Sequence, residues 1–275
     1  MDKIIELLKY FFFGAVQGIT ETLPISSSGH LIILGEVFAI EQGNDLTFEI
    51  LLHMGSLIAV IYFYRKSLGE LIKNFFAYLF KKDPEKKADF KYGWLIILAT
   101  IPAGIIGFLF NDIIAKYLAS LLTVGIGLII TGIILYFISK IPKGNKEKAD
   151  ITWFDALFIG IVQAFAIIPG ISRSGSTVSA GLSRKINIDN ALKFSFLLFI
   201  PVSLGASLLD IIHFINNPLA TKLFIPYLIA FLAATLFTLI SLNIFINIIK
   251  KGKLNYFAGY CFLVGLAVFI ISFII

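Results

Sequence analysis

Long apolar runs, separated by short polar segments, recur along the whole chain. Six of these runs are uninterrupted and close to the roughly 20 residues that an α-helix needs to cross a bilayer. Their apolar residues are continuous instead of alternating with polar ones, which favours an all-α integral membrane protein over a membrane β-barrel. We expect six full transmembrane helices, at about residues 47–64, 94–111, 118–139, 191–214, 223–249 and 255–275.

Two further apolar segments, 4–34 and 152–182, are interrupted near their middle. The interruptions are Pro24–Gly29 and Pro169–Gly175, and both contain several serines. Proline removes a backbone donor and serine offers the backbone alternative partners, so a straight helix through either break is disfavoured. We expect each segment to form a re-entrant hairpin of two half-helices. At membrane depth, such backbone requires a cavity enclosed by protein.

The two interrupted segments resemble each other. Gly14-Ala-Val-Gln17 precedes the first break, Gly160-Ile-Val-Gln163 precedes the second, and both breaks contain Ile-Ser-x-Ser-Gly. Each segment is followed by three predicted spans. The chain, residues 1–275, is therefore interpreted as a single membrane domain with one repeat at about 1–140 and a second at about 150–275. Because three is an odd number, the second copy is expected upside down, as an inverted-topology repeat.

The distribution of basic residues predicts the orientation in the membrane. The chain is 58% hydrophobic and 15% charged, with a net charge of +6. Lysine and arginine number 17 in one set of loops and 2 in the other set. The basic set is 65–93, 140–152, 183–190 and 250–254, and the other set is 35–46, 112–117 and 215–222. The positive-inside rule therefore makes the first set cytoplasmic and turns both termini outward.

The positive charge is explained by these cytoplasmic loops, and no basic motif interleaved with aromatic residues indicates nucleic acid as a partner. The segment 65–93 carries enough charge to form a surface helix and loop.

Ionisable residues inside apolar segments are costly, and here they gather at the two breaks. Glu21 follows Gln17 by four residues on the same helix face, His30 follows the first serine run, and Arg173 lies within the second. Helix N-termini with serine hydroxyls bind phosphate, and arginine adds forked donors. The residues thus indicate an anion site with a nucleophile, an acid or base, and a carboxylate. A serine that attacks phosphorus needs a base, and His30 and Glu21 both qualify.

Several alternatives stay open on this evidence. Serine and glycine runs often only break or pack helices, and the paired breaks fit the binding site of a lipid-phosphate flippase or anion transporter as well as that of an enzyme. An enzyme better explains why the two breaks differ in chemistry. Glu21 is a candidate ligand for a divalent cation, since hard cations prefer oxygen. His53 is interpreted as a structural residue at a span end, and Glu49 is ambiguous.

Three motifs carry a resemblance to a known family. They are Gln17-x-x-x-Glu21, Pro24-x-Ser-Ser-Ser-Gly-His30 and Pro169-Gly-x-Ser-Arg-Ser-Gly-x-Thr177. In type and order they resemble the signature motifs of the bacitracin-resistance type of undecaprenyl-diphosphate phosphatase, and the resemblance extends over the whole chain. It implies a hydrolase with an inverted repeat that removes the terminal phosphate of undecaprenyl diphosphate. The reaction would take place at the outer side of the bacterial cytoplasmic membrane, regenerate the lipid carrier of peptidoglycan synthesis and counteract bacitracin.

The resemblance also implies roles for single residues. Ser27 would be the nucleophile, Glu21 a base or a metal-linked acid, His30 a proton-handling group and Arg173 the phosphate stabiliser. The implied substrate-binding residues are Gln17, Ser26, Ser28, Ser172, Ser174 and Thr177.

The family further implies a divalent cation, Mg²⁺ or Ca²⁺. Gln17 stands where many relatives have glutamate and is expected to orient Glu21 or a water, since an amide cannot act as a base. The sequence leaves both a monomer and a homodimer open.

The orientation can be tested by cysteine labelling in intact cells. A cysteine placed beside Lys86 is expected to resist a membrane-impermeant thiol reagent, because Lys86 belongs to a predicted cytoplasmic loop. A cysteine beside Asn44 is expected to react. The reverse labelling pattern would contradict the inverted repeat.

Overall fold

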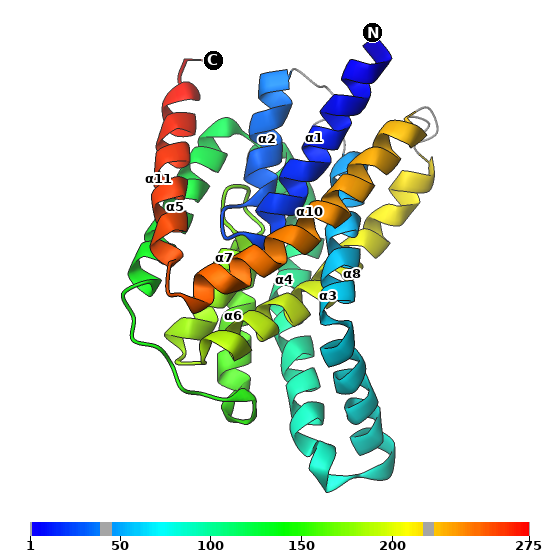
Figure 1. The fold of residues 1–275 in the computed structure, drawn as a ribbon, viewed down its shortest axis with the longest axis vertical. Helices are drawn as coiled ribbons and strands as arrows, with labels where there is room; N and C mark the ends of the chain where they lie inside the picture. Colours follow the sequence, from blue (N-terminus) through cyan, green and yellow to red (C-terminus); the bar gives the residue numbers. More distant parts are fainter. Residues whose placement is uncertain (1, 39–45, 217–222, 275) are drawn as a thin grey trace.

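The computed structural model describes residues 2–38, 46–216 and 223–274, and these residues form a helical protein (Figure 1). Six of the described helices are long and apolar enough to cross a membrane, which confirms a multi-pass, all-helical architecture. They are α3 (Leu46–Lys81), α4 (Lys87–Tyr117), α5 (Leu121–Ile138), α8 (Ile188–Asn216), α10 (Phe224–Lys250) and α11 (Leu254–Ile271). Much of the predicted loops 35–46 and 215–222, with Asn44, lies outside the described residues.

The two interrupted segments form helix pairs with a break between the members of each pair, as the prolines and serines predict. The first pair is α1 (Asp2–Thr22) and α2 (Ser27–Phe38), and the second is α6 (Trp153–Phe165) and α7 (Arg173–Ser183). Each break contains a residue in the left-handed region, with φ of +68° at Ser26 and +91° at Gly170. Within each pair the two helices pack against each other, so the chain turns back at the break.

The interpretation of 65–93 as a separate surface helix and loop was wrong in one respect. The transmembrane helix α3 continues without interruption to Lys81, and the turn that follows consists of Lys82, Asp83 and the short 3₁₀ turn η2 (Pro84–Lys86). Residues 65–81 contain no proline and a single glycine, so nothing in them stops a helix. The tip of the α3–α4 hairpin lies at one end of the molecule and both termini lie at the other (Figure 1).

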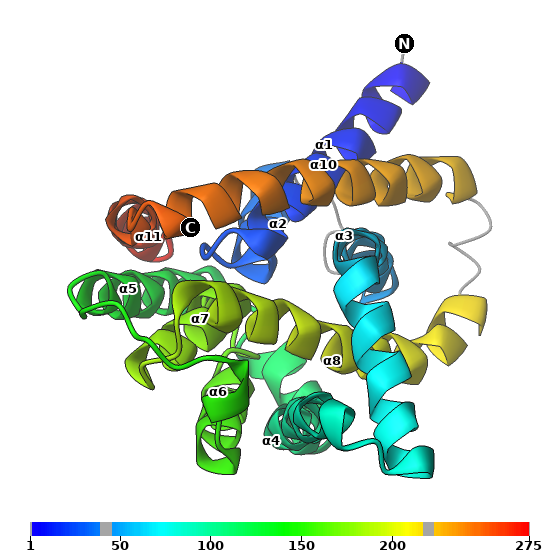
Figure 2. The same ribbon diagram turned by 60° about the horizontal axis from the view of Figure 1, so that its bottom comes forward.

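Glycines let helices from the two halves of the chain pack closely. A Cβ atom on Gly14 of α1 would collide with the backbone oxygen of Ala230 in α10, and one on Gly160 of α6 would collide with that of Ala99 in α4. Gly14 and Gly160 are the residues that the sequence repeat matches. Figure 2 shows α1 with α10 on one side and α6 with α4 on the other, while α3, α7 and α8 lie between them.

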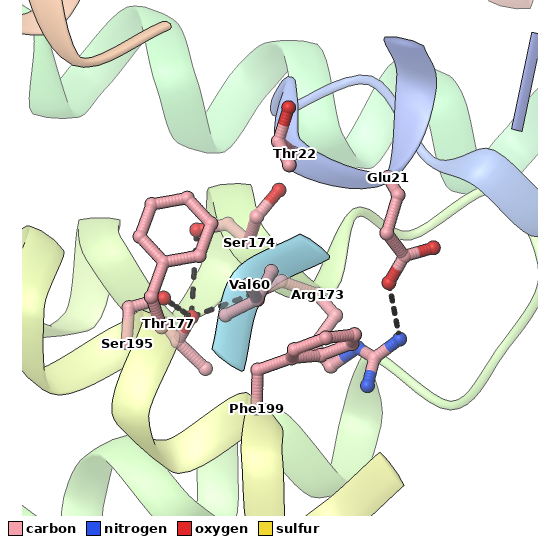
Figure 3. A pocket seen from close by; sticks show the side chains of 9 residues that line it. Glu21, Thr22, Val60, Arg173, Ser174, Thr177, Ser195 and Phe199 are labelled. Carbon is pink, nitrogen blue, oxygen red and sulfur yellow. Dashed lines mark hydrogen bonds and ion pairs between the residues drawn. The ribbon is translucent and has the colours of Figure 1, made fainter. Parts of the chain in front are cut away.

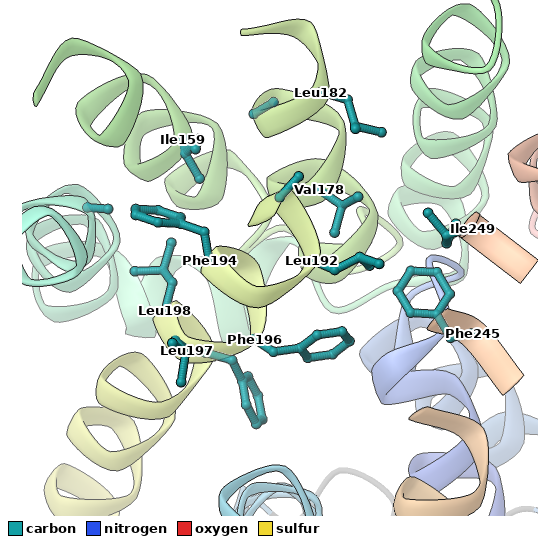
Figure 4. Close-up of a cluster of buried hydrophobic side chains, with 14 of the residues drawn as sticks. Ile159, Val178, Leu182, Leu192, Phe194, Phe196, Leu197, Leu198, Phe245 and Ile249 are labelled. Carbon is teal, nitrogen blue, oxygen red and sulfur yellow. The ribbon is translucent and has the colours of Figure 1, made fainter. Parts of the chain in front are cut away.

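The main hydrophobic core surrounds the first half of α8. Phe194 and Phe196 of α8 are buried there with Val178 of α7 and Phe245 of α10, and Ile159 of α6 also contributes (Figure 4). This core holds α7, whose first residue is Arg173, against α8. Large apolar side chains such as those of Phe108 and Leu263 are instead exposed on the outside, where lipid would solvate them.

A polar cluster joins the start of α6 to the end of α7, which are the helix ends away from the break. Asp155, in the first turn of α6, has no exposed surface and receives hydrogen bonds from Lys146 Nζ at 2.9 Å and Arg184 Nε at 2.7 Å. Thr152 and Asp155 form a capping box at the start of α6. Lys146 precedes the helix pair and Arg184 follows it, so the buried carboxylate joins both ends of the second interrupted segment.

The glycine contacts can be tested with a matched pair of substitutions. Gly14→Ala is expected to lower the free energy of unfolding by about 1–3 kcal/mol, because the added methyl group overpacks the α1–α10 contact. Gly259→Ala is the control, because a Cβ on Gly259 in α11 meets nothing within 4 Å. The control should leave stability unchanged or slightly raised. Equal melting temperatures for the two variants in detergent would contradict the close α1–α10 packing.

Candidate active site

The two breaks meet each other inside the protein. Ser26 Oγ accepts hydrogen bonds from Gly170 N at 3.1 Å and from Gly29 N at 3.3 Å. Ser174 Oγ donates to Leu23 O at 3.1 Å, which ties the start of α7 to the start of the first break, directly after α1. The serine turns of the two interrupted segments are therefore in direct contact.

The α5 helix supports the second break from behind. Thr131 Oγ1 lies 3.0 Å from Gly170 O and accepts a hydrogen bond from Ser172 N at 3.0 Å. Ser172 then caps α7, since its Oγ accepts from Gly175 N at 3.1 Å. Gly127 lets α5 come this close, because a Cβ there would lie 2.6 Å from Pro169 O. The backbone that presents Arg173 is thus held by hydrogen bonds at several points.

Glu21, at the end of α1, is the centre of the polar network. Its Oε2 atom accepts from Ser27 Oγ at 2.6 Å and from Gln17 Nε2 at 2.9 Å, and lies 3.2 Å from His53 Nδ1. Its Oε1 atom accepts from Arg173 Nη2 at 2.6 Å (Figure 3). A single buried carboxylate therefore joins α1, α2, α3 and α7.

The Arg173 side chain is oriented by α8 as well as by Glu21. Arg173 Nη1 donates to Ser203 Oγ at 3.1 Å, and the guanidinium carbon lies 4.5 Å from the centroid of the Phe199 ring. The ion pair, the hydroxyl and the stacked ring hold the planar fork in one orientation.

A cavity of about 200 Å³ lies against this network. Its polar wall combines the first serine run with Glu21 and Arg173, and further polar groups come from Glu49, His53 and Gln163. Apolar side chains from α4, from α8 and from the turn after α6 complete it, including Ala103, Val202 and Ile167. A cavity with a hydroxyl, a carboxylate and an arginine side by side is suited to binding an anion and transferring a phosphoryl group.

A much smaller cavity, of about 10 Å³, lies on another face of the Glu21–Arg173 pair (Figure 3). Thr22, Ser174 and Thr177 line it, and Thr177 Oγ1 lies 2.5 Å from Ser195 Oγ. The volume and the surrounding hydroxyl groups fit one ordered water molecule.

Comparison with known proteins identifies the family. The model of the bacitracin resistance protein BacA family matches residues 10–267. This chain belongs to the BacA family. It is 45% identical over 266 residues to the undecaprenyl-diphosphatase of Oceanobacillus iheyensis, covering 96% of each chain. It is 41% identical over 273 residues to undecaprenyl-diphosphatase 1 of Bacillus licheniformis, covering 99% of this chain and 100% of the relative. The resemblance deduced from the motifs is confirmed.

The structure of this BacA family member brings most of the sequence-predicted residues together. Glu21, Ser27 and Arg173 are in mutual or shared contact, and Ser26, Ser28 and Ser172 line the same cavity. Gln17 contacts Glu21, whereas Ser174 and Thr177 face the smaller cavity.

His30 is the predicted residue that does not join them. Its Nδ1 atom lies 2.7 Å from Ser26 O and its Nε2 atom 2.7 Å from Tyr260 OH, and its ring stacks on the ring of Tyr260. Because a carbonyl oxygen only accepts, Nδ1 carries a hydrogen and is occupied by the turn. Glu21, and not His30, is the group in contact with the Ser27 hydroxyl.

Sequence reasoning missed three residues of the BacA site. His53 lies between Glu21 at 3.2 Å and Glu49 at 3.6 Å, so its interpretation as a structural residue at a span end overlooked its place in the network. Glu49 and His53 are four residues apart on α3, the same spacing as Gln17 and Glu21 on α1. This shared spacing is the feature of the sequence that could have indicated that Glu49 and His53 belong to the site. Gln163 also lines the cavity, and its signal was its match to Gln17 in the repeat.

Proposed function

We propose that this chain is a membrane phosphatase that hydrolyses undecaprenyl diphosphate to undecaprenyl phosphate and inorganic phosphate. Curated relatives at 41–45% identity over nearly the whole chain carry the name undecaprenyl-diphosphatase. The observation that carries the proposal is the Ser27 hydroxyl at 2.6 Å from the Glu21 carboxylate, which also binds Arg173. The reaction regenerates the lipid carrier of peptidoglycan synthesis in the bacterial cytoplasmic membrane.

In the first step, Ser27 Oγ attacks the terminal phosphorus while Glu21 takes the hydroxyl proton. The bond from phosphorus to the bridging oxygen breaks, and undecaprenyl phosphate leaves with that oxygen. Serine is a weak nucleophile, and the 2.6 Å contact supplies the base that it needs. In the second step, water attacks the phosphoserine, inorganic phosphate leaves, and a proton returns to Ser27 Oγ.

Arg173 changes partner during the reaction. In the structure it is paired with Glu21, but a diphosphate carries more negative charge and offers the guanidinium fork two oxygens. When Arg173 turns to the phosphate, Glu21 has one cation fewer beside it and accepts the Ser27 proton more readily. Arg173 then stabilises the charge that develops on the transferring group.

The two histidines have different tasks in this proposal. His53 holds Glu21 from α3, on the side away from Arg173, and keeps the carboxylate aimed at Ser27. His30 acts through the turn, since it binds the carbonyl of Ser26 and so fixes the backbone that presents the serine run.

The residues fit a divalent cation, Mg²⁺ or Ca²⁺, that is shared with the diphosphate. In the described part of the chain, no group of three or more His, Cys, Asp or Glu side chains is arranged to hold a metal by itself. Glu21 and Glu49 nevertheless bring two carboxylates to one cavity, and Mg²⁺ commonly uses one or two carboxylates together with substrate phosphates. Such a cation would neutralise charge on the diphosphate oxygens.

The proposal includes the inverted repeat, with both broken segments as re-entrant hairpins and the site open to the outer side of the membrane. The matched glycines support the repeat, because Gly14 and Gly160 make equivalent contacts with α10 and α4. The positions of the termini and of the basic α3–α4 tip at opposite ends support the orientation. A lipid-phosphate flippase is the second candidate function. It is favoured by the contact between the two matched serine breaks, which fits a binding site shared by two repeats, but it leaves the Ser27 hydroxyl without a role.

The role of Glu21 can be tested by exchanging amide and carboxylate. Glu21→Gln is expected to lower turnover by about 10²–10⁴-fold, because an amide cannot take the Ser27 proton. Gln17→Glu is expected to keep most of the activity, with an altered dependence on divalent cations, since His53 can hold a second carboxylate. Phosphate release from undecaprenyl diphosphate is measured on purified protein in detergent, with and without EDTA. Turnover at the wild-type rate in Glu21→Gln would show that the carboxylate is structural.

The roles of Ser27 and Arg173 can be tested in the same assay. Ser27→Ala is expected to abolish turnover, and Arg173→Ala to lower it by about 10³-fold or more. Arg173→Lys should stay badly impaired, because a point charge does not reproduce the fork. Ser28→Ala is the comparison within the same serine run and is expected to lose less activity, since Ser28 Oγ contacts only Ser26 Oγ, at 3.4 Å, among the described hydrogen bonds. A folded Ser27→Ala protein that retains substantial activity would replace covalent catalysis by direct attack of water.

A further inference from the structure

Gln163 is a buried polar residue on the wall of the larger cavity, and its amide lacks a hydrogen-bond partner among the residues that the structure describes. It lies in α6, is 2% exposed and lines the same cavity as Ser27 and Arg173. Neither its Oε1 nor its Nε2 atom has a hydrogen-bond partner within the described ranges. Its counterpart in the first repeat, Gln17, instead donates to Glu21 at 2.9 Å. The two matched glutamines therefore have different environments.

An amide that is buried without partners destabilises a protein by about 1–3 kcal/mol. Such groups are rare in native proteins, and those that occur call for an explanation such as a catalytic role or a bound water. A purely structural residue at this position would be satisfied better by an apolar side chain, as Ala103 and Ile167 illustrate on the same wall. The cavity is the space from which a ligand can approach the Gln163 amide.

The chemistry of the amide favours water over phosphate as the group that it binds. Phosphate oxygens only accept hydrogen bonds, so they would satisfy Nε2 and leave Oε1 facing negative charge. A water molecule donates to Oε1, while Nε2 donates to an oxygen of the phosphoryl group that the water attacks. A glutamine orients the attacking water in this way in some GTPases.

We infer that Gln163 is the positioning residue for the water that attacks phosphorylated Ser27. The inference rests on the proposed function, because it concerns the second step of that reaction. The water oxygen bonds to phosphorus as the bond from phosphorus to Ser27 Oγ breaks. Glu21, which took the Ser27 proton in the first step, returns it to Ser27 Oγ and takes one proton of the water in its place. Inorganic phosphate leaves with the water oxygen and its other proton, and Glu21 releases its proton to solvent. Gln163 supplies no proton and fixes the direction of attack.

The test is the substitution Gln163→Met, which keeps the length of the side chain and removes both hydrogen-bonding groups. Rapid-quench time courses follow undecaprenyl phosphate, inorganic phosphate and protein-bound phosphate, with Ser27 examined by mass spectrometry. The expected result is a fall in kcat of about 10²-fold, the usual effect of losing one well-placed hydrogen-bonding group at the reacting centre. An initial burst of undecaprenyl phosphate should precede slow turnover, and phosphoserine should accumulate at Ser27.

The melting temperature provides a second readout. A purely structural role for the Gln163 amide predicts that Gln163→Met lowers the melting temperature, whereas the inferred role predicts that it does not. Because the Gln163 amide has no hydrogen-bond partner in the described part of the chain, Gln163→Met should melt at the same temperature as the wild type or above it. The control is Ile161→Met, which introduces the same methionine side chain on an exposed face of the same helix. It should leave activity unchanged. A lower melting temperature for Gln163→Met alone would show that the amide is bonded structurally and would overturn the inference.

The remaining outcomes separate this inference from the proposed function. Wild-type kcat in Gln163→Met, or a raised KM without a burst and without phosphoserine, would overturn the inference while the inactivity of Ser27→Ala still upheld the covalent step. Activity in Ser27→Ala would overturn the covalent step itself, and the inference would fall with it.

Discussion

A helix that is broken in an apolar medium leaves backbone groups that must find partners, and the rest of the structure depends on how this chain satisfies them. Each break supplies partners for the other. Ser26 Oγ accepts from Gly170 N, and Ser174 Oγ donates to Leu23 O. Thr131 Oγ1 of α5 supplies a further partner, because it donates to Gly170 O. The same hydrogen bonds between serine hydroxyls and backbone groups also bring Ser27 and Arg173 to the one carboxylate of Glu21.

The charged groups around the paired breaks determine which chemistry this site can carry out. Glu21 is surrounded by Ser27, Arg173 and His53, and Gln17 completes its hydrogen bonds. Burying one carboxylate among so many donors gives a fixed arrangement with little freedom to reorganise, which suits phosphoryl transfer. A bound diphosphate can change this arrangement, because it offers the Arg173 guanidinium more negative charge than Glu21 does.

The sequence predicts the helices and the breaks well because these follow from local rules. Apolar length predicts a span, and Pro24 with the serine run predicts an interruption. Contacts between helices do not follow from such local rules. His53 was assigned a structural role because nothing local reveals that α3 turns this residue toward Glu21. His30 follows the serine run by one glycine, yet the turn directs it to Tyr260. Such errors concern the rotation of a helix about its axis, which pairing between distant segments decides.

The unbroken α3 helix has a mechanical consequence. It contains 36 residues, which corresponds to about 54 Å, nearly twice the thickness of the hydrocarbon layer. Glu49 and His53 stand near one end of this rod. Its other end reaches Lys81, and Tyr78 near that end lines a surface hollow together with Trp94 and Lys91 of α4. Lysine and tryptophan settle at the membrane boundary. The rod therefore fixes the depth of Glu49 and His53, and of the Glu21 carboxylate beside His53, relative to the membrane boundary at its other end. Bilayer thickness thus sets how far below the opposite surface these groups lie.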